Sequence, residues 1–398
     1  MASLSLRAQA DAGFTWASLG RLLVLLLLAI VIAGCVPRTR PGPPPPEPEA
    51  PDTRPDTSRL PPDETRNRVA VLVPLSGPNA GIGQALLNAA NLALLDTGGQ
   101  RIRITAYDTA RGAQAAANEA IGDGSGLFLG PLLAEDVRAV APLARRENIP
   151  VIAFSNDVSV AGDNVFIMGF NPVQSIDRVV GFARSRGAQR FAALVPTGVY
   201  GQRTGQALRA AVEATGGTLV AMESYERGGE SLNAAATRLN TRGRYDAVLI
   251  ADGSRVALQA IPIVRQSSPQ PRILGTELWG AETNLGANVA LRGAWFAAPS
   301  DANFGTFRTR YRARYGSEPS YRLASLGYDA VLLAVRVAAD WPIGRRFPER
   351  ALRESTGFSG VDGAFRFGRD GVAERALEVR EVTAGGTNPV SPAPRGFN

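Results

Sequence analysis

The sequence contains no histidine and no lysine, so arginine accounts for all 43 basic residues of the 398-residue chain. Histidine is the usual general base and the commonest metal ligand, and lysine supplies Schiff-base amines and the cation of phosphate-binding loops. The single cysteine, Cys35, excludes an internal disulfide and any cysteine-rich metal site. These absences favour a non-enzymatic binding protein that needs no cofactor and no metal.

Catalytic motifs are absent as well. Gly81-Ile82-Gly83 lacks the third glycine of a dinucleotide-binding fingerprint. The sequence contains no Gly-x-Ser-x-Gly, and a Ser-His-Asp triad would have no histidine to use. A hydrolase that works with two carboxylates is the enzymatic alternative, although no spacing of Asp and Glu favours one.

The first 34 residues have the organisation of a signal peptide. Arg7 and Arg21 supply positive charge, and an apolar run extends from Leu22 to Ile32. That run is shorter than the ~20 apolar residues of a transmembrane helix. It ends in Ile32-Ala33-Gly34-Cys35, which resembles the lipobox of bacterial lipoproteins, whose cysteine becomes the lipidated first residue of the mature protein. The alternative is a lone cysteine behind an uncleaved anchor helix.

The residues after Cys35 predict the subcellular localisation of the protein. Val36 stands where an aspartate would resemble an inner-membrane retention signal, so we expect a lipid anchor in the outer membrane, facing the periplasm. Eleven of the 28 prolines lie between residues 37 and 62, which predicts an extended, disordered tether over residues 35–66. The net charge of +7 would suit nucleic acid, but an exported protein meets none, and we expect no such partner.

The folded part begins with a strand, a turn and a helix. Residues 69–73 form an almost unbroken apolar run, which is typical of a strand buried on both faces. Residues 74–78 carry turn chemistry, and apolar residues then recur at helical spacing from Ile82 to Ala93. This order starts a parallel α/β sheet, in which ligands bind where strands end. We therefore expect Ser76 and Gly77 to lie near any ligand.

Strand-like and helix-like segments alternate through the rest of the chain. A helix from about residue 133 to 144 carries acidic residues early, basic residues late and a kinking proline, Pro142. The series begins again near Asn171, which suggests two doubly wound lobes. Strands are expected at residues 102–107, 126–129, 150–154, 191–195, 219–224, 247–250 and 273–274, two helices over 304–339, and a hairpin over 361–382.

The order of several short motifs resembles the type I periplasmic binding proteins, which include branched-chain amino acid receptors. These motifs are VLVPLSGP from Val71, FLGPL from Phe128, IPVIAFS from Ile149, VYGQ from Val199 and LGYDAV from Leu326. The resemblance implies two Rossmann-like α/β lobes joined by three crossovers, near Asn171, Pro299 and Trp341. Lobe 1 would combine residues 67–171 with 300–340, and lobe 2 would combine 172–299 with 341–383, followed by a flexible tail over 384–398.

A narrower resemblance is to the lipoprotein activators of penicillin-binding proteins. It rests on the lipobox, the proline-rich tether, the turn at residues 155–157, VFIMGFNP from Val165, and GVDGAFRFGRDGVAERALEVREV from Gly360. It implies a partner, a bifunctional penicillin-binding protein that synthesises peptidoglycan. The best-known members carry a helical-repeat domain before this fold, and the tether leaves no room for one. The alternative is a solute-binding lipoprotein of an ABC transporter, for a branched-chain amino acid or a similar small polar ligand.

Two leucines argue against an amino acid ligand. Amino acid receptors of the family hold the ligand carboxylate with small hydroxyl residues after the Gly-Pro turn and at the end of the next strand. Leu132 and Leu133 follow the turn here and cannot donate hydrogen bonds, although backbone donors at Gly130 would compensate in part. Ser155 and Asn156 end the next strand, but Asp157 beside them would repel a carboxylate.

Glu277, in contrast, favours an amino acid ligand. It stands where amino acid receptors place a carboxylate for the ligand ammonium, although a solvated or hinge carboxylate is the alternative interpretation. Tyr200 either faces the cleft or has a packing role, and Asp108 either lines the cleft or caps the next helix. The candidate cleft residues are Ser76, Gly77, Asp108, Gly130, Pro131, Ser155, Asn156, Asp157, Tyr200, Asp252 and Glu277.

Arginines alternate with aromatic residues over 307–315. The pattern predicts a helix with a buried aromatic face and a solvated basic face, and contact with an acidic partner is the alternative.

Overall fold

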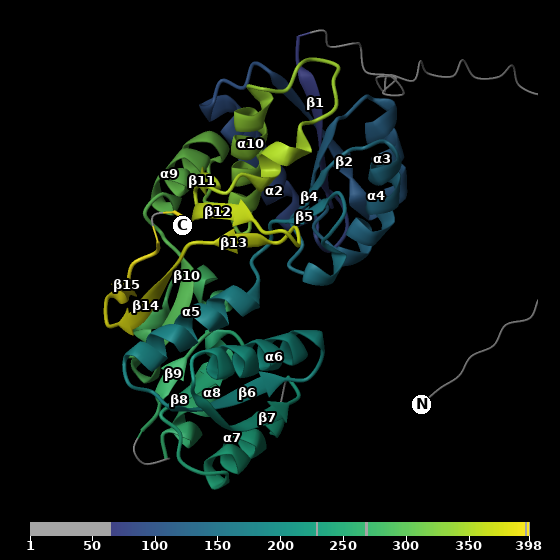
Figure 1. The fold of residues 1–398 in the computed structure, drawn as a ribbon. Coiled ribbons are helices and arrows are strands. Elements are labelled where there is room, and N and C mark those ends of the chain that lie inside the picture. The colour runs from purple at the N-terminus through teal and green to yellow at the C-terminus, as the bar shows by residue number, and fades with distance from the viewer. Residues whose placement is uncertain (1–64, 228–229, 267–269, 395, 398) are drawn as a thin grey trace, which may run out of the picture. The chain divides into compact units, whose positions relative to one another are not determined.

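The computed structural model describes residues 65–227, 230–266, 270–394 and 396–397 (Figure 1). The expected signal peptide, the lipidated Cys35 and almost all of the expected tether lie outside these residues. Among the helices that the model describes, none is both long enough and apolar enough to cross a membrane.

The first lobe is built on a five-stranded parallel sheet in the order β2-β1-β3-β4-β5. Strands β1, β3, β4 and β5 are almost wholly buried, which explains their apolar sequences, whereas the edge strand β2 is partly exposed. Helices α3 and α4 pack on one face, and α2, α9 and α10 cover the other. The elements are β1 (Asn67–Val73), α2 (Ala80–Asp96), β2 (Ile102–Asp108), α3 (Ala113–Gly122), β3 (Leu127–Leu129), α4 (Ala134–Arg146), β4 (Val151–Ala153), β5 (Val165–Ile167), α9 (Phe304–Tyr315) and α10 (Ala324–Ala338).

The second lobe is built on a seven-stranded sheet in the order β15-β14-β10-β9-β8-β6-β7. Helices α5 and α6 pack on one face, and α7 and α8 on the other. The elements are α5 (Pro172–Ser185), β6 (Arg190–Pro196), α6 (Val199–Ala214), β7 (Thr218–Tyr225), α7 (Ser231–Thr241), β8 (Ala247–Ile250), α8 (Ser254–Val264), β9 (Arg272–Leu274), β10 (Trp295–Pro299), β14 (Leu377–Thr383) and β15 (Gly386–Ser391).

The two lobes share one strand order. The parallel strands β7-β6-β8-β9-β10 repeat the arrangement β2-β1-β3-β4-β5 of the first sheet. Strands β14 and β15 extend the second sheet with antiparallel pairs. Both sheets are therefore doubly wound in the same way, and the α/β prediction of two Rossmann-like lobes is confirmed.

The C-terminal part divides differently from the sequence-based assignment of residues 341–383 to lobe 2. Strands β11 (Phe358–Gly360), β12 (Gly363–Phe367) and β13 (Ala373–Arg375) form a separate antiparallel sheet. Trp341, Phe347, Phe365 and other apolar residues of this part belong to the core of the first lobe. Their burial against α10 and β5 decides the placement, so the chain crosses to lobe 2 after β13 instead of near Trp341.

Residues 384–398 also differ from the expected flexible tail, because β15 pairs with β14 over residues 386–391. The hairpin expected over 361–382 exists between β12 and β13 only. The sequence analysis missed α3, β5 and β10. Helix α3 is rich in alanine and carries only a weak apolar stripe, and the two strands are three and five residues long.

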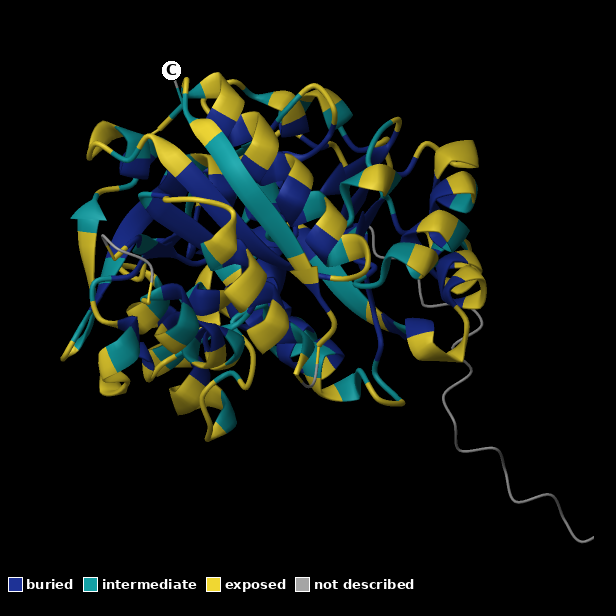
Figure 2. Cartoon of the chain, turned by 90° about the horizontal axis from the view of Figure 1, so that it is seen from below, coloured by how far each residue is buried: buried dark blue, intermediate teal, exposed yellow. Residues whose placement is uncertain are grey.

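The helices turn their exposed residues outward and their buried residues toward the sheets (Figure 2). Helix α10 lies against α2, and its buried residues include Gly327. A Cβ atom at Gly327 would lie 2.2 Å from the backbone oxygen of Leu86 in α2. The two helices approach this closely because glycine has no side chain at the crossing.

We expect Gly327→Ala to destabilise the protein by roughly 1–3 kcal/mol, because α2 and α10 must move apart. Gly181→Ala in α5 is the matched control, since nothing lies within 4 Å of a Cβ atom there. The control should be neutral or stabilising by up to about 1 kcal/mol, through helix propensity alone. Thermal and urea unfolding measure both changes, and equal stability of the two variants would contradict the close packing.

Candidate functional site

A cleft of about 590 Å³ lies where the strand ends of the two lobes meet. From the first lobe come the segments that follow β1, β3, β4 and β5, and from the second lobe those that follow β9 and β10. The segment before α10 closes one side. The lining residues are Asn79, Ile82, Leu132, Leu133, Phe154, Asn156, Phe170, Glu277, Leu278, Gly280, Ala281, Pro299, Ser320, Tyr321, Arg322 and Leu323.

The cleft wall is mostly apolar. Leucine, isoleucine, phenylalanine, tyrosine and proline supply most of its side chains, and only two charged groups, Glu277 and Arg322, belong to the lining. A cavity of a few hundred cubic ångströms with few polar groups is typical of small-molecule sites. The arrangement can desolvate a small apolar body and orient it by a few hydrogen bonds.

The turn after β3 offers no polar side chain to the cleft. Gly130 and Pro131 are joined by a cis peptide bond, and Leu132 and Leu133 beyond it line the wall. The backbone N–H of Gly130 donates to the carbonyl of Ile152 at 2.8 Å, within the sheet. The expectation that backbone donors at Gly130 would compensate for the leucines is therefore wrong for this N–H.

Asp108 holds the turn after β1. Its carboxylate accepts hydrogen bonds from the Leu75 N–H at 2.7 Å, the Ser76 hydroxyl at 2.7 Å and the Ala110 N–H at 3.0 Å. Burial raises the pKa of Asp108, but these bonds outweigh it and the pKa is lowered. Ser76 and Asp108 thus bind each other, and neither belongs to the lining of the cleft; nor does Gly77, which lies exposed in the turn.

Asp157 pairs with arginines from both lobes. It lies 2.5 Å from Arg203 on α6 of the second lobe and 3.1 Å from Arg138 on α4 of the first. Burial raises the pKa of Asp157, but hydrogen bonds from Ser159 and the charge of Arg203 lower it to about 2. The expectation that Asp157 would repel a ligand carboxylate is wrong, because its charge is paired outside the cleft lining.

Ser155 is buried beside this pair, and its hydroxyl oxygen accepts the Asp157 N–H at 3.1 Å. Asn156, the residue between them, does line the cleft. Within the turn at residues 155–157, Asn156 therefore faces the cleft, and Asp157 forms the interlobe ion pair with Arg203.

Glu277 lies in the cleft wall within a short chain of hydroxyl groups. The Tyr200 hydroxyl donates to Glu277 Oε1 at 3.0 Å and lies 3.1 Å from the Thr276 hydroxyl. Glu277 Oε2 is buried and has no hydrogen-bond partner among the described residues. Burial raises the pKa of Glu277 to about 7, and burial with the nearby carboxyl also raises the pKa of Tyr200.

Asp252 lies outside the cleft lining. Its carboxylate accepts from Arg227 at 2.8 Å and from the Tyr225 hydroxyl at 3.0 Å. Arg227 also lies over the ring of Tyr200, 5.8 Å from its centroid. Asp252 therefore supports the wall behind Tyr200 and Glu277 by holding Arg227.

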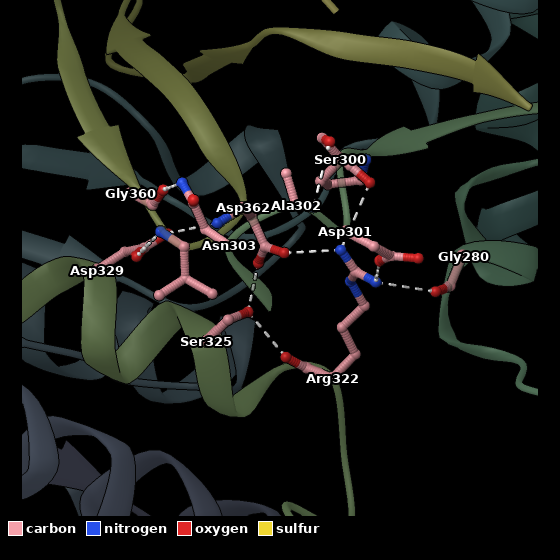
Figure 3. Close-up of polar contacts among 12 residues, drawn as sticks. Gly280, Ser300, Asp301, Ala302, Asn303, Arg322, Ser325, Asp329, Gly360 and Asp362 are labelled. Atoms are coloured by element: carbon pink, nitrogen blue, oxygen red, sulfur yellow. Dashed lines mark hydrogen bonds and ion pairs between the residues drawn. The ribbon is translucent and has the colours of Figure 1, made fainter. Parts of the chain in front are cut away.

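Arg322 ties the cleft to the second crossover between the lobes (Figure 3). Its guanidinium lies 2.5 Å from Asp301 in the crossover and 2.8 Å from the buried Asp362. It also donates to the carbonyls of Gly280 at 3.3 Å and Pro299 at 3.4 Å. Arg380 on β14 pairs with the same Asp301. One arginine of the cleft wall thus binds both lobes and the chain between them.

A second buried arginine joins the other two crossovers. Arg375 donates to the carbonyl of Met168 at 2.7 Å and lies between the rings of Phe170 and Phe365. Burial lowers the pKa of Arg375. Asp329 nearby accepts the Val361 N–H at 2.6 Å, and burial with the charge of Asp362 raises the pKa of Asp329 to about 7.

The sequence analysis found part of this site. Of its candidate residues, Asn156 and Glu277 line the cleft, and Tyr200 contacts Glu277. It missed Asn79, Phe154 and Phe170, which follow strand ends and could have been found by that rule. Tyr321 and Arg322 carried no signal, because they lie between two helices. Their place depends on how α10 packs.

The basic face of α9 is largely paired on the molecule itself. Arg308 and Arg312 bind Glu318, and Arg310 binds Asp96. Phe307 and Tyr311 are buried, as the predicted aromatic face requires. Nothing in this arrangement favours an acidic partner.

We expect Arg203→Ala to favour the open arrangement of the lobes, because it removes the ion-pair partner that Asp157 has in the second lobe. Partly exposed ion pairs contribute about 0.5–1 kcal/mol, so the closed population should fall several-fold. Small-angle scattering should report a larger radius of gyration.

Arg145→Ala is the matched control, since it breaks an ion pair of similar length, to Asp163, within the first lobe alone. Scattering from this variant should equal that of the wild type. A larger radius in both variants, or in neither, would contradict a specific role for Arg203.

We also expect the stability of the ligand-free protein to fall as pH rises from about 5 to above 7. The pKa of Glu277 is about 7 in the folded chain against an ordinary 4.5, so ionisation favours the unfolded state within this window. The contribution of Glu277 should reach about 1.4 kcal/mol per pH unit. Glu277→Gln should remove this contribution in urea titrations and leave that of Asp329, whose pKa is also raised, whereas Glu354→Gln, a carboxylate paired with Arg336, should leave the pH dependence unchanged.

Comparison with known proteins agrees with this geometry. The family model described as periplasmic binding protein matches residues 67–387. A candidate branched-chain amino acid ABC transporter protein of Rhodospirillum rubrum is 21% identical, with a TM-score of 0.73 over 82% of this chain and 100% of that one. The binding protein LivJ of Streptococcus pneumoniae, solved with isoleucine, is 19% identical, with a TM-score of 0.59 over 82% and 100%.

Among curated sequences, an uncharacterised protein of Rickettsia prowazekii is 25% identical over 174 residues. The match covers 43% of this chain and about half, 47%, of that relative. The predicted resemblance is confirmed by the family match and the fold: the chain belongs to the periplasmic binding protein family, with the type I fold of the leucine-binding proteins.

Proposed function

We propose that the protein is a non-enzymatic solute receptor that closes two lobes over a small, largely apolar ligand and presents it to an ABC transporter. The observation that carries the proposal is the cleft itself, which takes its wall from both lobes and from the segment between them. A ligand in such a place contacts both lobes only when they are closed, so binding favours closure.

The relatives support this function better than the interpretation as an activator of a penicillin-binding protein. Structural neighbours carry names of branched-chain amino acid transport, and one was solved with isoleucine. We propose the same class of small-molecule partner for this chain. Attachment at Cys35 to the outer membrane, with the folded part in the periplasm, belongs to the same proposal.

The activator role is a second candidate, favoured by one observation. Leu132 and Leu133 leave the first lobe without hydroxyl donors where amino acid receptors hold a carboxylate. A binding protein that has lost its ligand could use the same hinge to bind a peptidoglycan synthase. Cross-linking in cells separates the two functions, because the receptor should recover permease subunits and the activator a bifunctional penicillin-binding protein.

Ala281→Trp tests the receptor function directly. Ala281 is exposed in the ligand-free cleft wall, so a tryptophan should fill the cleft without disturbing the core. We expect solutes that co-purify with the wild type, detected by native mass spectrometry, to be lost from this variant. Ala115→Trp on the exposed side of α3 is the control and should retain them. Equal retention by both variants would show that the cleft is not the binding site.

A further inference from the structure

In the described ranges of the chain, the charged groups around the cleft include a carboxyl group without a cation but no cation without a carboxylate. Arg227 and Arg322, the arginines beside the wall, are each paired with a carboxylate, whereas Glu277 has no cationic partner among the described residues. Resting on the proposed receptor function, we propose that the ligand is an apolar amine that binds as a cation against Glu277 and carries no carboxylate.

Glu277 is held ready to accept a hydrogen bond. Thr276 is fully buried, and its hydroxyl lies 3.1 Å from that of Tyr200, which in turn donates to Glu277 Oε1. The Tyr200 hydroxyl thus connects the Thr276 hydroxyl with one carboxyl oxygen of Glu277. Oε2 is buried with no partner among the described residues. A buried acceptor without a donor costs free energy unless a ligand or a proton supplies the missing bond.

Within the part of the chain that the structure describes, no arginine pairs with Glu277. From α6 it meets the uncharged Tyr200, and behind that ring Arg227 is paired with Asp252 at 2.8 Å. Within its own segment Glu282 accepts hydrogen bonds from Ser254. From the segment before α10, Arg322 is paired with Asp301 and Asp362.

The cleft provides no matching site for an anion. Both Nη atoms of Arg322 are occupied by carboxylates and carbonyls. Its Nε is buried and has no hydrogen-bond partner among the described residues, but the charge of the guanidinium is balanced by Asp301 and Asp362. Glu135 and Asp136 occupy the first turn of α4 and oppose the favourable dipole at its N-terminus. Asn79 and Asn156 are the only amide side chains in the lining. A ligand carboxylate would therefore share an apolar cleft with Glu277 and no free cation.

An ammonium group supplies both the missing hydrogen-bond donor and the missing positive charge. It donates to the unpartnered carboxyl oxygen, and its charge replaces the proton that burial otherwise keeps on Glu277 near neutral pH. Amines of this class stay protonated well above neutral pH, as lysine does. Binding should consequently release a proton from Glu277, and amine affinity should increase as pH rises toward and through neutrality.

The test uses three probes with one apolar body: isoamylamine, leucine and 4-methylpentanoate. They carry an amine alone, an amine with a carboxylate, and a carboxylate alone. Titration calorimetry on the mature protein, freed of co-purified solute, should show isoamylamine binding at least tenfold tighter than the other two. The affinity for isoamylamine should rise about tenfold per pH unit below pH 7. The measured binding enthalpy should change with the ionisation enthalpy of the buffer, which reports the release of a proton.

Two variants assign the effect to one carboxyl group. Glu277→Gln should weaken isoamylamine at least tenfold and abolish the pH dependence, with an unchanged circular dichroism spectrum. Glu282→Gln, five residues along and bonded to Ser254 instead of facing the cleft, should bind like the wild type. An unchanged affinity in Glu277→Gln would overturn the proposal.

The outcomes also separate this proposal from the receptor function. Tighter binding of leucine or 4-methylpentanoate would overturn the amine class but leave a cleft that binds solutes. Failure of all three probes, while Ala281→Trp still loses a co-purified solute, would likewise reject the amine alone. If no solute co-purifies and no probe binds, the receptor function itself fails.

Discussion

The contact of Arg322 with Asp301 and Asp362 holds the rest of the structure in place. It lies where the second crossover leaves β10, and it reaches both lobes through carbonyl and carboxylate oxygens. Two carboxylates offset the cost of burying one guanidinium, and removing Arg322 would take the ion-pair partner from the fully buried Asp362. The position of α10, and with it one side of the cleft, therefore depends on this group of charges.

The same pairing determines what the cleft can recognise. Because Arg322 is neutralised within the hinge, it contributes shape and little free charge to the wall that it lines. On the opposite lobe, the Oε2 atom of Glu277 is buried and has no such partner among the described residues. A fold with two equivalent sheets thus has an asymmetric cleft: its apolar first lobe excludes water, and its second lobe supplies one carboxyl group. The ion pair of Asp157 and Arg203 joins the two lobes.

Much of the fold follows from local sequence. Buried parallel strands give apolar runs, and long amphipathic helices give a regular stripe, so β1, α2 and α4 were predicted close to their observed bounds. The alanine-rich α3 and the short strands β5 and β10 lack either signal. Residues 341–375 were placed in the wrong lobe because their apolar pattern is the same whichever core buries it.

The sequence by itself determined the doubly wound α/β class, the absence of histidine and lysine chemistry, and the position of Glu277 after a strand end. These follow from residue types and from spacing along one segment. The tertiary structure decided that Asp157 pairs with Arg203, that Gly130 donates within its sheet, and that Arg322 reaches the cleft. Each of these joins residues from separate segments, and charge pairing between distant segments leaves no periodic trace in a single sequence.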